Sequence, residues 1–519
     1  MSEPKKVDRR KFIYAGLGAV ALIAIGAAAY VAMNPPVVTQ TTTVPTTSVV
    51  TTTVPTTSVV TTTSVATTTV PTTSIVTTTT TKYVGVVLKV PQMAGWASQA
   101  PGIALVNEFE NSTGIKVVYD MIPPADVASK EWLEVSNRTG NYDIVTVGAD
   151  RIHPRFLPYC IGLNKYIEAT WGSIKNFEDK VFLTPQRSAV YQGEYRGIPI
   201  HANVMFGVYR KSLFEDPKNQ KAFESTYGYE LRQPRTLQEV EDIASFFTKP
   251  PMYGLTANLI GAPAPAGFSL FLHCFMSAGF DVLDKNFRPT MKYDDKAYEV
   301  AVEIARWWQD GIYKKKFINP DAAKFKAADM FDFYMSGMAA MGFGWFGDIF
   351  GIKLQTKDVI DKIGESVDFV WPSFRPQSES GGFASYWIHG ILDTCKNPDA
   401  AWEYIKWVAS ERYQLACAAV QVPPFKDLAE KANHMPNPNN PNIPLLPNAL
   451  YQSFLKGARI WFYIRELDQN VPELCYEPWD TALQLWGSLM ANQITPEKLV
   501  EEWAKAIETK LEASGYYKK

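Results

Sequence analysis

The chain has 519 residues, of which 46% are hydrophobic, 13% aromatic and 20% charged, and its formal net charge at pH 7 is −2. This length predicts two or more folded units, and the balanced charge gives no global field that would attract nucleic acid. Five scattered His residues and five Cys residues without a CxxC pair argue against a metal site or cofactor. The odd number of cysteines leaves open either one or two disulfides or buried free thiols.

The N-terminal segment has the pattern of a membrane anchor or signal. Residues 1–11 are basic, and residues 12–33 are uncharged and would span about 33 Å as a helix. The basic flank predicts a cytoplasmic N-terminus, with everything downstream outside. Arg9-Arg10 resembles a twin-arginine export signal, although Asp8 replaces the usual Ser or Thr. We favour a retained anchor over cleavage at Ala27-x-Ala29, and no cysteine follows for a lipid anchor.

Residues 34–82 form a spacer of low complexity. TTTVPTTSVV occurs at 41–50 and again at 51–60, and TTTVPTTSIV follows at 67–76. Thr, Ser, Val and Pro cannot bury enough side chain to offset the entropy of ordering, so we expect a disordered stalk of up to roughly 140 Å. Such a composition is also typical of O-glycosylated stalks, and the sequence leaves open whether glycans are present.

The folded part begins with an alternation of strands and helices. A β-branched run at 83–90 predicts a strand, a helix follows that ends near Gly114, and further strands are expected at 115–121 and 142–148. This order predicts an α/β domain with parallel pairing, which binds ligands beyond the carboxyl ends of its strands. The loops after the first and third strands therefore supply the first candidate binding residues, namely Trp96, Asp150 and Arg151.

The same alternation continues to the C-terminus. We expect a strand that leads into a helix start within 192–216, a further strand at 253–259, and an apolar strand within 338–350 that breaks into a Gly-rich loop. Helices are expected after Thr236, over 301–311, after Asn397-Pro398 and after Thr495-Pro496, where caps and apolar periodicity coincide. The folded part is α/β throughout and long enough for two lobes.

Four segments resemble family 1 extracellular solute-binding proteins, which include the maltodextrin-binding proteins. The resemblance covers 83–519 and rests on the order of short motifs: Gly197-Ile198-Pro199 with 204–214, Pro234-x-Thr236-x-x-Glu239, Ala339-Ala340-Met341-x-Phe343-Gly344-Trp345, and Val370-Trp371-Pro372 with Gly381-Gly382 and Asn397-Pro398-x-Ala400-Ala401. In place of the family's Tyr-Asn-Lys this chain has Tyr209-Arg210-Lys211, a structural segment.

The resemblance implies a two-lobe, type II periplasmic-binding-protein-like α/β fold, preceded by the N-terminal helix and the stalk. Lobe 1 would comprise 83–200 with 365–420, and lobe 2 would comprise 201–364 with 421–519. Crossing strands are expected near 199–205, 365–374 and 420–425. A carbohydrate would bind between the lobes of a monomer outside the membrane, and an ABC permease with its ATPase would receive it.

A sugar site needs aromatic plates and planar hydrogen-bonding groups. Trp345 is the foremost candidate, because it lies in a Gly-flanked loop where packing alone does not require an indole. The other candidate ligand-binding residues are Asp348, Trp96, Asp150, Arg151, His201, Asn203, Tyr386, Trp387, Trp461 and Tyr463. Tryptophans on apolar helix faces are assigned to the core instead: Trp307, Trp308, Trp402, Trp407 and Trp503. Asn111 and Asn137 begin N-glycosylation sequons.

Three other functions remain open. A tethered glycoside hydrolase would need two carboxyl groups across the cleft, and the chain carries no recognisable hydrolase motif. A structural envelope protein would explain the stalk but would more often be rich in β-structure. A peptide receptor would share the architecture, whereas a metal receptor is disfavoured by the few scattered His and Cys. We expect a binding protein, not an enzyme.

Overall fold

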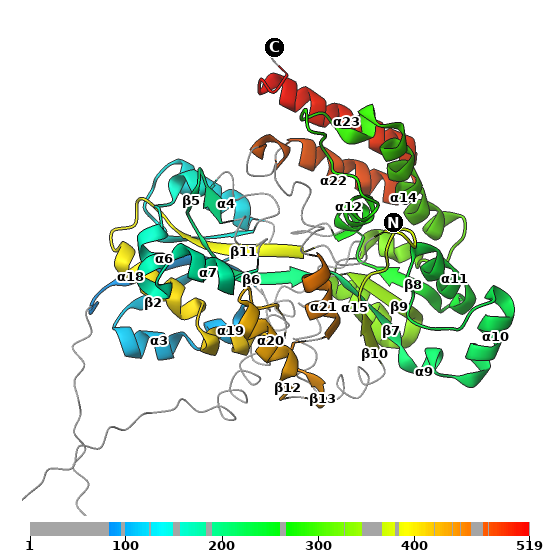
Figure 1. Ribbon diagram of the computed structural model, residues 1–519, viewed down its shortest axis with the longest axis horizontal. Helices are drawn as coiled ribbons and strands as arrows, with labels where there is room; N and C mark the ends of the chain where they lie inside the picture. The colour runs from blue at the N-terminus through cyan, green and yellow to red at the C-terminus, as the bar shows by residue number, and fades with distance from the viewer. Residues whose placement is uncertain are drawn as a thin grey trace, which may run out of the picture.

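Helices flank the strands of two lobes, seen side by side in Figure 1; one lobe is built on a three-stranded sheet with a parallel strand pair beside it, and the other on a four-stranded sheet. The computed structural model describes residues 83–94, 99–123, 126–148, 156–182, 189–259, 266–325, 327–344, 366–378, 384–419, 421–438, 440–446, 448–457, 471–475 and 477–517. The expected N-terminal helix and stalk therefore lie outside the described residues. Among the helices described, none combines the length and apolar character needed to cross a bilayer.

Lobe 1 is built on strands from both halves of the chain. β1 pairs in parallel with β2, as expected, while β11 lies between β3 and β6 and is antiparallel to both. β1 runs beside β3, because the N–H of Asp143 donates to the carbonyl of Lys89 at 3.0 Å. The bounds are β1 Val87–Met93, β2 Lys116–Ile122, β3 Ile144–Gly148, β4 Val190–Tyr191, β5 Glu194–Tyr195, β6 Ile198–Val204, β11 Ala384–Ile391, α2 Ala100–Ile103, α3 Val106–Thr113, α4 Val127–Ser136, α6 Asn164–Trp171, α7 Ile174–Lys180, α18 Pro398–Val408 and α19 Glu411–Cys417.

Lobe 2 has a four-stranded sheet in the order β10-β7-β9-β8, in which only β8 and β9 are parallel. Its bounds are β7 Phe206–Arg210, β8 Tyr253–Ala257, β9 Ala339–Gly344, β10 Ser366–Phe369, α9 Lys211–Phe214, α10 Pro217–Tyr227, α11 Leu237–Phe247, α12 Ala266–Ser277, α13 Thr290–Tyr293, α14 Asp295–Tyr313, α15 Ala327–Phe333, α22 Glu477–Met490 and α23 Pro496–Ala513. Near the junction of the lobes lie α20 Lys426–His434, β12 Pro436–Asn437, β13 Asn440–Pro444 and α21 Asn448–Gly457 (Figure 1).

The chain passes between the two sheets at three places. β6 belongs to lobe 1 and β7 to lobe 2, so the first crossing is at Met205. β10 still pairs with β7, and β11 pairs with β3, so the second crossing falls within 370–383. At the third crossing the backbones of Ala202 and Val422 exchange hydrogen bonds of 3.1 and 2.7 Å.

These strand partners move the lobe boundaries away from those expected from sequence. Residues 201–204 remain in the lobe 1 sheet, whereas the sequence-based boundary assigns them to lobe 2. Residues 366–369 pair with β7 in lobe 2, whereas the boundary at 365 assigns them to lobe 1. The difference arises because sheet membership is decided by hydrogen-bond partners far away along the chain, which strand propensity does not encode.

Local signals in the sequence set the ends of several elements. Gly114 ends α3 with φ 77°, as expected from its position. β1 begins at Val87 instead of Tyr83, because the N–H of Val86 donates to Tyr83 O and closes a turn. Thr495 caps α23 through the N–H of Lys498. Asn397 occupies the N-cap position of α18, but its side chain makes no capping hydrogen bond.

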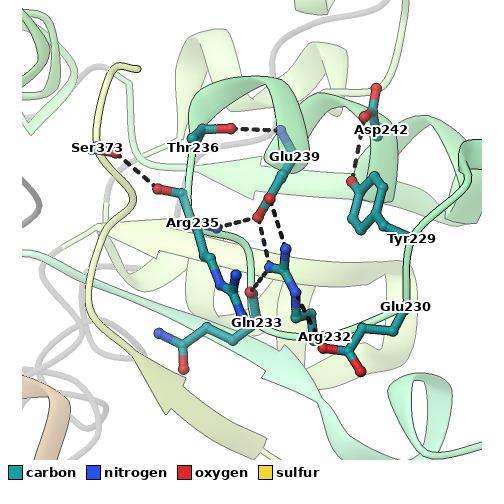
Figure 2. Close-up of polar contacts among 9 residues, drawn as sticks. All are labelled: Tyr229, Glu230, Arg232, Gln233, Arg235, Thr236, Glu239, Asp242 and Ser373. Atoms are coloured by element: carbon teal, nitrogen blue, oxygen red, sulfur yellow. Dashed lines mark hydrogen bonds and ion pairs between the residues drawn. The ribbon is translucent and has the colours of Figure 1, made fainter. Parts of the chain in front are cut away.

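The start of α11 shows how one such signal is joined to tertiary structure (Figure 2). The Thr236 hydroxyl accepts from the N–H of Glu239, and the Glu239 carboxylate accepts both guanidinium N–H groups of Arg232 at 2.8 Å. Ser373, near the second crossing, donates from its N–H and its hydroxyl to the carbonyl of Arg235. The cap of α11 therefore also fixes the lobe 2 end of the second crossing.

Most of the tryptophans assigned to the core are buried. Trp308, Trp402 and Trp503 have 0, 4 and 2% of their surface exposed, which confirms their assignment, and Trp307 and Trp407 are partly buried at core edges. Four cysteines within the described residues are free thiols: Cys160, Cys274, Cys395 and Cys417.

Candidate ligand site at the junction of the lobes

The strand ends of lobe 1 meet at one edge of its sheet. Trp387 in β11 lies opposite both Gly148, the last residue of β3, and His201, near the end of β6. The carboxyl ends of β3 and β6 and the start of β11 therefore share the edge from which the chain crosses to lobe 2. A ligand bound in the usual place for an α/β sheet would contact this edge.

Lobe 2 presents a matching edge. Phe206, the first residue of β7 after the crossing, pairs with Gly344, the last residue of β9. Because β8 is parallel to β9, both strands end on the side of the first crossing. α21 packs against β6, β7 and β10, and its Phe454 contacts Phe182 of lobe 1 with ring centroids 4.7 Å apart. The junction is thus lined by strand ends from both lobes and by α21.

Seven of the candidate site residues lie outside the described residues: Trp96, Asp150, Arg151, Trp345, Asp348, Trp461 and Tyr463. The described elements nevertheless locate where these segments begin. They follow β1, β3 and β9 at their carboxyl ends and α21 at the junction. Their role in binding stays a prediction. It is supported by the position of the described elements that precede them, which end or pack at the junction.

The other four candidates lie on paired strands at the junction. Asn203 is opposite Ser385, and Tyr386 is opposite Ala202. Trp387 is partly buried and packs on the core of lobe 1. His201 is only 2% exposed, and burial lowers its pKa to about 4 although the hydrogen bond to Gln421 raises it. His201 is therefore neutral at pH 7. It is held beside the first and third crossings, which we call the hinge region.

A buried polar network surrounds His201, and the sequence did not reveal it. Gln421 Oε1 lies 2.5 Å from His201 Nδ1 and accepts from Gln99 Nε2 at 2.7 Å. Gln99 in turn accepts from the Tyr413 hydroxyl at 2.7 Å. The only sequence signal was that Gln421 falls inside the expected third crossing. Glutamines so far apart in the chain gave no sign that they meet.

Asn258 is a second residue that sequence reasoning missed. It directly follows β8 and is 2% exposed, and its Oδ1 finds no hydrogen-bond partner within the described part of the chain. This oxygen lies 2.1 Å from where a Cβ on Gly344 would be, so any larger residue at 344 would have to displace the Asn258 side chain. Its place after a strand end, at the base of the segment that carries Trp345, was the available signal.

The described residues give little support to metal or acid–base chemistry. No group of three or more His, Cys, Asp or Glu that could hold a metal occurs among them. Glu131 in α4 has a pKa raised to about 8 by burial, although the N–H of Thr146 donates to it. It is 1% exposed and lies within lobe 1.

The two-lobe α/β architecture with three crossings defines a class of receptor, and comparison with known families agrees. The model of the bacterial extracellular solute-binding protein family matches residues 96–415, more than half of the 519 residues. The chain belongs to this family, whose members bind solutes outside the cytoplasm. A search of curated protein sequences gives no match.

Solved structures share the fold at low sequence identity. Maltose-bound MalE3 of T. maritima has a TM-score of 0.62 and 18% identity, and a solute-binding protein of Agrobacterium radiobacter K84 in complex with ribitol has the same values. Lmo0181 of Listeria monocytogenes in complex with cycloalternan has a TM-score of 0.61 and 14% identity. Each similarity covers 82% of this chain and 99% of the other. Identities this low establish the shared fold alone.

Proposed function

We propose that this chain is the substrate-binding component of an ABC importer and captures a carbohydrate between its lobes. The observation that carries the proposal is that three described elements end or pack at the junction directly before stretches of sequence that carry aromatic residues. Trp345 follows β9, Trp96 follows β1, and Trp461 follows α21, and all three elements end or pack there. Aromatic rings stack on the C–H faces of sugars, while amide and carboxylate groups accept their hydroxyls.

The structural relatives support the choice of ligand class. Their bound molecules are maltose, ribitol and cycloalternan, all of which carry many hydroxyl groups. We propose that this chain releases its ligand chemically unchanged to a permease, because the family is one of binding proteins.

The N-terminal segments would hold this receptor at the membrane. In our proposal residues 12–33 remain as a single anchor, and 34–82 separate the lobes from the bilayer. Retention predicts that alkaline carbonate leaves the protein in the membrane and that detergent releases it. An N-terminal sequence that begins after Ala29 would show that the helix is cleaved instead.

We propose that glycans on the two sequons would leave the ligand site free. Asn111 and Asn137 are exposed and lie at the carboxyl ends of α3 and α4. Each of these helices leads into the amino end of a lobe 1 strand, which is opposite to the edge facing lobe 2. We propose both as N-glycosylation sites, and mass spectrometry of peptides from the native protein tests their occupancy.

A ligand screen tests the proposed function directly. Purified protein is titrated with maltose, maltotriose, ribitol, cycloalternan and a set of short peptides while thermal stability and tryptophan fluorescence are followed. A ligand at 100 times its Kd should stabilise the fold by about 2.7 kcal/mol. Trp345→Ala should abolish both signals, whereas Trp307→Phe, at a core edge in lobe 2, should leave them intact.

Two results would count against the proposal. Stabilisation by peptides alone would keep the receptor and replace the substrate class. Recovery of a cleaved sugar from the mixture would indicate a hydrolase. An unchanged response in Trp345→Ala would remove that residue from the site and leave the proposed function standing on the other aromatic residues.

A further inference from the structure

A one-way chain of hydrogen bonds runs through the hinge region. The Tyr413 hydroxyl donates to Gln99 Oε1 at 2.7 Å, Gln99 Nε2 donates to Gln421 Oε1 at 2.7 Å, and Gln421 Nε2 donates to Gln414 Oε1 at 3.3 Å. Gln414 Nε2 ends the chain on the carbonyls of Ile200 and Val408 at 2.9 and 2.8 Å. Each amide donates in the same direction, so every link depends on the one before it.

Gln421 is the branch point of this chain. Its side-chain oxygen accepts from Gln99 and faces His201 Nδ1, which must carry the proton because an amide oxygen cannot donate. Gln99, Gln414 and Gln421 are 0% exposed, so water cannot replace a lost partner. Removal of Gln421 would therefore take away the hydrogen-bond partner that Gln99 Nε2 and Gln414 Oε1 have in it.

The network joins α2 and α19 of lobe 1 to the two segments that lead into lobe 2 at the first and third crossings. Gln99 begins α2 in lobe 1, and α2 packs on α19, where a Cβ on Gly102 would come within 2.2 Å of the Tyr413 ring. His201 lies in β6, one residue before Ala202, and Gln421 precedes Val422. Ala202 and Val422 are the two residues that tie the first crossing to the third.

We propose that Gln421 is a positioning residue that couples α2 to the first and third crossings. The start of α2 then follows the hinge when the crossing strands change their angle. This inference deepens the proposed function, since α2 lies at the base of the segment after β1, but its geometry does not depend on which ligand is bound. The coupling is reciprocal, so a change in α2 should alter the crossings and a change at the crossings should alter α2.

Hydrogen–deuterium exchange of the unliganded full-length protein tests the coupling without any ligand. Gln421→Met keeps the length of the side chain and removes its hydrogen bonds. We expect amide exchange in peptides covering 99–106, 198–206 and 421–425 to accelerate about tenfold, the factor that corresponds to 1.4 kcal/mol. Gln99→Met should act from the other end and accelerate 198–206 and 421–425 as well.

Gln309→Met is the matched control. Gln309 is also buried and its substitution removes two buried hydrogen bonds, to the carbonyls of Leu489 and Ile494, against three at Gln421, but it lies in α14 of lobe 2. Its effect should stay within α14 and the segment after α22, with 99–106 and 198–206 unchanged. The control separates a general loss of stability from a loss of coupling.

Each outcome decides the proposal. If Gln421→Met accelerates exchange only in 414–425, or if the control accelerates 99–106 equally, Gln421 is a packing residue and the proposal is wrong. If Gln421→Met does not fold, Gln99→Met and Tyr413→Phe, which removes a single donor, provide the same test. Failure of the ligand screen would overturn the proposed function and leave these exchange results as they are.

Discussion

The buried carboxyl of Glu131 makes the stability of lobe 1 depend on pH. Its Oε1 accepts from the N–H of Thr146 at 3.0 Å, and the hydroxyl of Thr146 also lies 3.3 Å from the buried His389 ring. Burial raises the Glu131 pKa from 4.5 to about 8. The folded protein therefore keeps this carboxyl protonated at neutral pH, whereas the unfolded chain ionises it.

The sign and size of the effect follow from this difference. Below pH 4.5 the carboxyl is protonated in both the folded and the unfolded protein, so its raised pKa does not change the free energy of unfolding. This free energy falls as the pH rises from 4.5 to about 8, because only the unfolded chain then ionises the carboxyl. The loss amounts to about 3 kcal/mol at pH 7 and about 5 kcal/mol at pH 9. Glu131→Gln retains an acceptor for Thr146 and cannot ionise, so it should regain these amounts.

Urea unfolding at pH 5, 7 and 9 measures the prediction. The stability of Glu131→Gln relative to the natural protein should grow steadily with pH, while the two should nearly coincide close to pH 4.5. Glu168→Gln on α6 removes the same charge from an exposed site and should show no such trend. A difference for Glu131→Gln that stays constant from pH 5 to 9 would mean that Glu131 ionises normally, and the reasoning would fail.

Three further predictions concern other described residues. Glu239→Gln should destabilise the protein by about 2 kcal/mol at pH 7. Burial raises the Glu239 pKa, but its hydrogen bonds to Arg232 and to the N–H of Arg235 outweigh burial and hold the pKa below the ordinary value. The stabilisation by Glu239 is therefore present above the ordinary carboxyl pKa and lost as the pH falls, which urea unfolding at pH 7 and pH 3 tests. Trp308→Ala should cost about 3–5 kcal/mol in the same assay, and the partly buried Trp307→Ala clearly less. Three buried thiols should resist a thiol reagent until the protein unfolds, because burial raises each pKa, and reaction in the folded state would refute their burial: Cys160, Cys274 and Cys417.

Features that depend on neighbouring residues could be predicted from the sequence. The N-cap at Thr236 and the end of α3 at Gly114 appear where expected, and β1 and β2 pair in parallel as expected although β1 begins at Val87. Short-range hydrogen bonds and side-chain periodicity decide these elements, and both are written in consecutive residues. The order of the family motifs also predicted the two-lobe class and the approximate positions of the crossings.

Tertiary structure alone decided which polar groups are buried and which partners they find. Gln99 and Gln421 are 322 residues apart, and Tyr413 and Gln99 are 314 apart, yet each pair is joined by one hydrogen bond. Glu131 on an amphipathic helix looks like any exposed carboxylate until Thr146 of β3 is placed against it. The sequence by itself determined the class of protein, the elements and the candidate aromatic residues. The packing of α4 on β3 decided the buried acid, and the strand pairings at the crossings decided the glutamine network, because no local pattern encodes such contacts.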